Sequence, residues 1–124
     1  MILNPDKVYY FASPYSSKDP VIQNQRYLEQ QRLVAHLIKD HELSIINPIE
    51  MCHEMSKRYG LPSGYEFWQK RDKKLISISD GIVVALMPGW DVSVGVSNEI
   101  AYAISISKEV WYLDPHSLKV SKKP

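Results

Sequence analysis

The segment at residues 81–103 constrains the fold of this chain more than any other part of the sequence. It opens with an apolar, mostly β-branched run at residues 82–86, which predicts a strand buried on both faces, as in a parallel sheet. Residues 87–91 follow as a loop, because proline and glycine interrupt regular structure there. Apolar residues then recur at helical spacing from Val96 onward. The segment therefore predicts a strand, a loop and a helix in succession.

The rest of the sequence repeats this alternation of strands and helices. Strands are expected at residues 7–12, 43–46 and 109–113, and helices at 20–40, 49–59, 63–78 and 95–107. Such an alternation implies right-handed parallel crossovers and a three-layer α/β domain with a flavodoxin-like or Rossmann-like parallel sheet. The chain order predicts four strands in the spatial order 2-1-3-4, with a fifth strand as the alternative. Residues 1–124 are expected to form one domain, with 114–124 as a frayed tail.

Two loops are expected to meet where the strand order reverses. Ligands of open α/β sheets bind at the carboxyl ends of the strands, at this switch point. In the predicted order it lies between the first and third strands, which brings the loops at residues 13–17 and 87–94 together. These loops carry the aromatic residues Tyr15 and Trp90, on which a base or a sugar could stack, and the carboxylate of Asp91.

Composition limits the classes of function. The formal net charge is +1, so no basic field indicates a nucleic-acid polymer as the partner. A single cysteine, Cys52, permits no intramolecular disulfide and suits a reducing cytosol, so a cytoplasmic location is expected. No signal peptide and no bilayer-spanning apolar run is recognisable, and no membrane partner is expected. The four histidines show no metal-ligand spacing with Cys52 or with each other, so no metal site is expected. No cofactor is expected either.

Two helical carboxylates are the strongest candidates for catalysis. Glu99 stands about one turn into the last predicted helix, at the edge of its apolar face, and Asp72 lies on the helix before the central strand. Two carboxylates over one crevice are what the cleavage of a glycosidic bond requires. The plainer alternatives are a solvated helix carboxylate for Glu99 and an ordinary helical ion pair for Asp72.

Small hydroxyl residues offer an anion site at the same place. Ser13, Ser16 and Ser93, with backbone N–H groups near Gly95, could hold a phosphate at a helix N-terminus. An N-cap role for Ser93 is equally compatible with the sequence. The chain contains neither a P-loop nor a GxGxxG motif, which disfavours triphosphates and dinucleotides.

Two stretches resemble a known family. Residues 10–16, YFASPYS, and residues 88–99, PGWDVSVGVSNE, look like the DUF1937 family, which is similar to the nucleoside 2-deoxyribosyltransferase superfamily. The resemblance runs from about residue 8 to residue 113, and the Gly-Trp-x-x-Ser-x-Gly-x-x-x-Glu pattern is its more specific part.

This resemblance implies roles for individual residues. In the superfamily the glutamate that closes the motif attacks C1′ of a nucleoside, which implies that role for Glu99, with Asp72 assisting it. In relatives that hydrolyse 5′-monophosphates the serine of the motif binds phosphate, which implies Ser93. Contacts of the first loop with the sugar or the phosphate are implied for Ser13, Tyr15 and Ser16.

The expected function is therefore cleavage of the N-glycosidic bond of a nucleoside 5′-monophosphate or a nucleoside, giving a glycosyl-enzyme at Glu99 and a free base. The alternatives are a nucleoside 2-deoxyribosyltransferase, a non-catalytic nucleotide-binding or sensor domain, and a structural or interaction protein. Superfamily relatives form dimers or larger oligomers, and the helix at 63–78 begins with an aromatic cluster. A homo-oligomer, at least a dimer, is expected through this helix or through 95–107.

Overall fold

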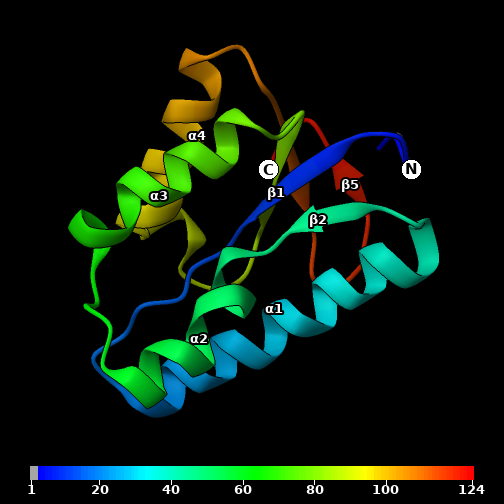
Figure 1. Cartoon of the computed structure of the whole chain (residues 1–124). Coiled ribbons are helices and arrows are strands. Elements are labelled where there is room, and N and C mark those ends of the chain that lie inside the picture. Colours follow the sequence, from blue (N-terminus) through cyan, green and yellow to red (C-terminus); the bar gives the residue numbers. More distant parts are fainter. Residues whose placement is uncertain (1–2) are drawn as a thin grey trace.

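The computed structural model describes residues 3–124 of the chain (Figure 1). The elements in chain order are β1 (Val8–Ala12), α1 (Pro20–His41), β2 (Ser44–Ile46), α2 (Pro48–Tyr59), α3 (Tyr65–Ser77), β3 (Gly81–Ala85), the short 3₁₀ helix η1 (Trp90–Val92), α4 (Val94–Ser105), β4 (Glu109–Leu113) and β5 (Val120–Ser121). Every strand and helix expected from the sequence is present, with ends shifted by no more than about two residues, the usual uncertainty of such boundaries.

The sheet has five strands in the order β2-β1-β3-β4-β5. The first four in chain order are parallel, and β5 runs antiparallel to β4. The central strand β3 pairs with β1 on one side and β4 on the other, and all five of its residues are buried. These observations confirm the α/β class and the expected order 2-1-3-4, and they establish the fifth strand.

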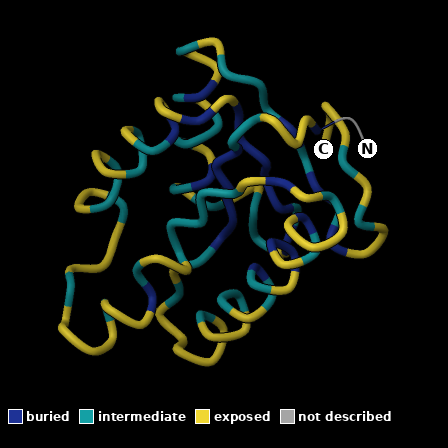
Figure 2. Tube along the Cα trace, turned by 45° about the vertical axis from the view of Figure 1, so that its right-hand side comes forward, coloured by how far each residue is buried: buried dark blue, intermediate teal, exposed yellow. Residues whose placement is uncertain are grey.

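Helices cover both faces of the sheet, which makes three layers (Figure 1). Successive strand side chains point to opposite faces. On β1, Tyr9 and Phe11 therefore pack with Leu33 and Leu37 of α1, while Tyr10 packs on the other face with α3 and α4. Figure 2 shows the resulting pattern, with the buried strands at the centre and the exposed helix turns outside.

Polar caps set the beginnings of three helices. The side chains of Asp19, Asn47 and Ser93 accept hydrogen bonds from N–H groups in the first turns of α1, α2 and α4. Each cap satisfies a backbone donor that has no partner inside its helix. On α1 the buried residues are Gln30, Leu33, Val34 and Leu37, whereas Leu28 and Ile38 are exposed. None of the helices in residues 3–124 is both long and apolar enough to cross a membrane.

The C-terminal segment is not the frayed tail that its lysines and prolines suggest. After β4 the chain turns, with Oδ1 of Asp114 accepting hydrogen bonds from the N–H groups of His116 and Ser117. Val120 then pairs with Leu113, so β5 closes the edge of the sheet. The side chains of Leu118 and Val120 also pack against the hydrophobic core that lies between α1 and the sheet. Backbone pairing and apolar contacts together fix the segment.

Candidate active site

A cavity of about 560 Å³ opens at the carboxyl ends of β1 and β3. Its walls come from the loop after β1, the first turns of α1, α2, the start of α3, and the η1–α4 segment. This is the switch point of the sheet, where the two loops were expected to meet. The residues predicted from the sequence that line it are Ser13, Tyr15, Ser16, Asp72, Ser93, Gly95 and Glu99.

Two predicted site residues do not line the cavity. The ring of Trp90 lies edge-on to Tyr112, with ring centroids 6.0 Å apart, and packs against the core on the α3–α4 side of the sheet. Asp91 is exposed in the 3₁₀ helix η1 and does not line the cavity. The predicted stacking of a ligand on Trp90 is therefore wrong, because this ring packs in a hydrophobic core. The predicted substrate contact of Asp91 is also wrong, because Asp91 lies outside the cavity lining.

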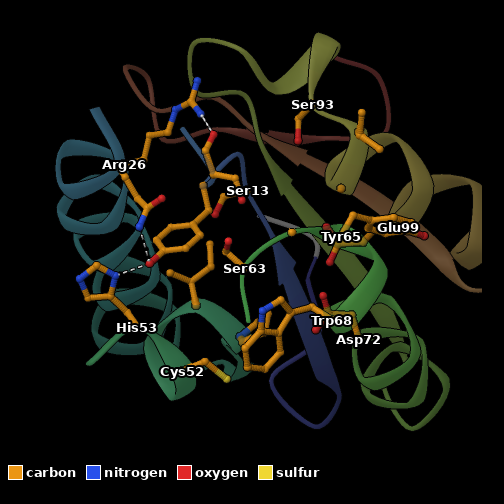
Figure 3. Close-up of a pocket in the computed structure, with 18 of the residues that line it drawn as sticks. Ser13, Arg26, Cys52, His53, Ser63, Tyr65, Trp68, Asp72, Ser93 and Glu99 are labelled. Atoms are coloured by element: carbon orange, nitrogen blue, oxygen red, sulfur yellow. Dashed lines mark hydrogen bonds between the residues drawn. The ribbon is translucent and has the colours of Figure 1, made fainter. Parts of the chain in front are cut away.

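Glu99 and Asp72 share one end of the cavity (Figure 3). They come from adjacent helices, α4 and α3, which pack against each other on the same face of the sheet. The buried hydroxyl of Tyr10, on β1, donates a hydrogen bond to Oε2 of Glu99. Tyr65, at the start of α3, lies on the same wall. Tyr10 and Tyr65 were not recognised from the sequence, where tyrosines in a strand and a helix resemble ordinary core residues.

Burial changes the acidity of this group of residues. It raises the pKa of Glu99 to about 8, a rise that the Tyr10 hydrogen bond opposes and the charge of Asp72 increases. It also raises the pKa of Asp72 to about 6, against the opposing influence of Arg71 and Tyr10. The pKa of Tyr10 lies well above its usual value because of burial and the two carboxylates. The carboxyl pair therefore retains about one proton between pH 6 and 8.

A cation lies on another side of the cavity. Nη1 of Arg26, in the second turn of α1, donates a hydrogen bond of 2.8 Å to the carbonyl of Ser16. Its guanidinium also covers Gly89, where a Cβ would lie 2.8 Å from Nη2. Gly89 has a φ of 93°, a backbone conformation that strains other L-residues and so favours glycine. Arg26 thus ties the loop after β1 to the loop after β3. Sequence reasoning missed it, since an arginine on a surface helix is commonplace.

Two serines and the N-terminus of α4 line the same cavity as Arg26. Ser13 is buried, and within the described chain its Oγ has no hydrogen-bond partner. Ser93 caps α4, with its Oγ accepting from the N–H of Val96 at 3.2 Å, which confirms the N-cap interpretation. Both serines and Gly95 line the cavity, so this side combines a positive charge, a free hydroxyl and a helix N-terminus. Such a set of groups suits an anion.

The third side of the cavity carries no formal charge at neutral pH. Ile49, Cys52 and His53 of α2 form one wall, and Trp68 of α3 closes it, with its Nε1 donating 2.8 Å to the carbonyl of Pro62. Burial raises the pKa of the Cys52 thiol and lowers the pKa of His53. This wall suits a neutral, flat ligand group. Its residues were missed because they are distributed over two helices, α2 and α3.

No group of three or more His, Cys, Asp or Glu side chains in residues 3–124 is arranged to hold a metal ion. The chemistry that this cavity offers is that of a carboxyl pair sharing a proton, opposite an anion-binding side and beside an uncharged wall.

The fold and the cavity define a class: a small Rossmann-like α/β domain with a pair of carboxyl groups in a pocket at the switch point of its sheet. Within that class, the chain belongs to the family DUF1937, a domain of unknown function, whose model matches residues 7–114. This confirms the family indicated by the two motifs. A comparison with curated proteins found no match.

Proposed function

We propose that this protein cleaves the N-glycosidic bond of a nucleoside 5′-monophosphate by way of a glycosyl-enzyme. The observation that carries the proposal is the Glu99–Asp72 pair, which shares one end of a cavity whose other sides suit a phosphate and a base. Pairs of carboxyl groups with pKa values pushed apart are the usual means by which glycosidic bonds are cleaved at neutral pH.

In the first step Glu99 acts as the nucleophile. One of its carboxylate oxygens forms a bond to C1′ while the bond from C1′ to the base nitrogen breaks, and that electron pair leaves with the base. Near neutral pH the pair holds one proton, mainly on Glu99, so the reactive form is the less populated one in which Asp72 carries that proton and Glu99 is ionised. The base takes this proton from Asp72 and departs as a neutral molecule. Tyr10 holds the Glu99 carboxylate through its hydrogen bond during the attack.

In the second step water attacks C1′ and gives up a proton to the Asp72 carboxylate. The bond between C1′ and Glu99 breaks, which restores the carboxylate and releases the sugar phosphate. A second base could replace water as the acceptor, and the reaction would then be a transfer. Hydrolysis is favoured because the cavity provides an anion site, which a sugar phosphate can occupy while water enters.

The anion-binding side supports a 5′-phosphate as part of the substrate. Arg26 supplies a permanent positive charge, since a guanidinium does not lose its proton in proteins. The free hydroxyl of Ser13 and the N-terminus of α4 add hydrogen-bond donors for phosphate oxygens. The base would then lie against the uncharged wall of Cys52 and Trp68, with C1′ between the two ends.

The decisive experiment is incubation of the protein with a panel of nucleosides and their 5′-monophosphates, with free base measured by chromatography. We expect free base from at least one monophosphate and much less from its nucleoside. Addition of a second base separates transfer from hydrolysis. Binding of a nucleotide without any turnover would instead establish a non-catalytic nucleotide-binding domain.

A further inference from the structure

The hydroxyl group of Tyr15 lies between two nitrogen atoms on the wall of the cavity (Figure 3). Nε2 of Gln23, one turn into α1, donates a hydrogen bond of 3.2 Å to the phenolic oxygen. Nδ1 of His53, on α2, lies 2.5 Å from the same oxygen. In the chain from residue 3 to residue 124, these are the two hydrogen bonds that this hydroxyl makes.

The other nitrogen of His53 indicates which atom carries the ring proton. Nε2 is buried and has no hydrogen-bond partner among the described residues. A buried N–H without an acceptor is rarer and more costly than a buried lone pair without a donor. Burial also lowers the pKa of His53, which favours a neutral ring with a single N–H group. The proton therefore belongs on Nδ1, and Nε2 is bare.

This tautomer determines what Tyr15 can offer to a ligand. With the proton on Nδ1, both nitrogen atoms donate to the phenolic oxygen, which has two lone pairs and accepts both bonds. The O–H proton of Tyr15 then has no acceptor in the described part of the protein, although the side chain lines the cavity. A hydroxyl with its acceptor capacity filled and its proton free is a directed hydrogen-bond donor.

The histidine itself is held rigidly. Its ring stacks on Tyr27 of α1, with centroids 3.7 Å apart and planes 11° from parallel, and lies edge-on to Tyr15. The hydroxyl of Tyr27 is engaged outside the cavity by Gln31, whose Nε2 donates at 3.1 Å. α1 and α2 thus fix the orientation of the imidazole, and through it the direction of the Tyr15 hydroxyl.

We propose that Tyr15 donates a hydrogen bond to an acceptor atom of the substrate's base, and that His53 is the positioning residue that makes Tyr15 a donor. The inference rests on the proposed function and names the feature by which that site would recognise a base. The position supports the base over the other parts of a nucleotide. His53 places the Tyr15 hydroxyl beside α2 and the uncharged wall, whereas the carboxyl pair and Arg26 occupy the other sides.

The first test needs no ligand and no activity. Long-range ¹H–¹⁵N spectra of the histidine rings, with His53 assigned through a His53→Asn variant, report which ring nitrogen carries the proton. We expect the Nδ1–H form at neutral pH. The Nε2–H form would overturn the inference, because Tyr15 would then donate to His53 and have no proton for a ligand.

The second test measures binding by calorimetry in the Glu99→Gln background, which prevents turnover. Tyr15→Phe should weaken the preferred nucleoside monophosphate by about 3- to 10-fold, the range for a neutral hydrogen bond, and leave ribose 5-phosphate unchanged. Equal weakening of both ligands would overturn the base contact. Tyr59→Phe, which removes the hydroxyl of an exposed tyrosine outside the cavity, is the matched control and should change neither.

Variants of His53 separate positioning from simple packing. His53→Asn keeps an N–H group near the Nδ1 position and should retain most of the affinity, whereas His53→Leu should reproduce the loss seen with Tyr15→Phe. Full affinity in His53→Leu would overturn the positioning role. A wild-type protein that binds no nucleotide at all would overturn the proposed function, and the tautomer test would still decide the donor geometry.

Discussion

The hydroxyl of Tyr10 donates a hydrogen bond to Oε2 of Glu99, joining the first strand of the sheet to the last helix. Tyr10 is fully buried, and its pKa lies well above its usual value, so it stays protonated and remains a donor at neutral pH. Glu99 has little freedom to turn away from the cavity while this bond holds. A buried tyrosine thus fixes the orientation of the proposed nucleophile.

The ionisation of the carboxyl pair predicts a bell-shaped dependence of kcat/KM on pH. Below about pH 6 both groups carry protons, so Glu99 cannot attack, and above about pH 8 neither can protonate the leaving base. Activity should therefore be highest near pH 7, where the pair shares one proton. Initial rates at low substrate concentration from pH 4.5 to 9.5 would measure this profile. A rate that kept rising through pH 9 would contradict a proton-sharing pair.

Replacement of Glu99 with glutamine should abolish turnover while the fold is kept. The amide is nearly isosteric and still accepts the hydrogen bond from Tyr10, but it is not a nucleophile. We expect kcat to fall by about three orders of magnitude or more. Glu54→Gln is the matched control, because Glu54 is exposed on α2 and does not line the cavity. Wild-type turnover in Glu99→Gln would exclude Glu99 as the nucleophile.

The same substitution should stabilise the protein in alkaline solution. The pKa of Glu99 in the folded protein, about 8, exceeds the ordinary value of 4.5. Between these values the unfolded chain releases its proton and the folded protein keeps it, so the free energy of unfolding falls as pH rises. Glutamine cannot ionise, so the free energy of unfolding of the variant does not fall in this way as pH rises. The midpoint of thermal unfolding should exceed that of wild type by at least about 3 °C at pH 8.5, with little difference at pH 4.5. A difference that did not change with pH would contradict the raised pKa.

Arg26→Met should weaken nucleoside monophosphates and leave nucleosides nearly unchanged. Methionine keeps much of the side-chain volume but removes the charge that we assign to the phosphate. A hydrogen bond to a charged group contributes about 1.5–3 kcal/mol, roughly 10- to 150-fold in affinity. The control is Arg32→Met on the same helix, because Arg32 pairs with Glu29 outside the cavity. An equal loss for nucleosides and monophosphates would remove Arg26 from the phosphate site.

Ser93→Ala separates two roles of one hydroxyl. Loss of the cap on α4 should lower the free energy of unfolding by about 1 kcal/mol. If Ser93 also contacts phosphate, monophosphates should weaken far more than nucleosides. Calorimetry with both ligand types, alongside thermal unfolding, distinguishes these effects. A loss of stability with equal binding losses would leave only the capping role.

We expect at least a homodimer formed through α3 or α4. Both helices keep large apolar side chains in solvent, with Phe67 50% and Ile104 62% exposed, and an exposed apolar patch is a common mark of an interface. Light scattering at micromolar concentration measures the mass, and Ile104→Glu should shift it to a monomer. Leu28→Glu, at a similarly exposed position on α1, should not. A wild-type mass near 14.3 kDa with full activity would contradict the dimer.

The sequence determined the order of the elements and the sheet topology. Runs of β-branched residues, helical spacing and turn residues act over short distances, and right-handed crossovers then leave few arrangements. The same local signals located both loops of the cavity, the cap at Ser93 and the two carboxylates. They misjudged the C-terminal segment, because pairing of Val120 with Leu113 is a long-range contact that lysines and prolines do not reveal.

Only the tertiary structure decided which side chains share the cavity. Tyr10, Arg26 and His53 stand on three different elements, and nothing in their local sequence distinguishes them from core or surface residues. The structure also removed Trp90 from the site, because its ring fills space against Tyr112. The local sequence sets the spacing of apolar residues, and therefore the face of a helix or strand on which each side chain lies. The packing of elements that are distant in sequence decides what it faces, and burial there sets the pKa values on which the proposed chemistry depends.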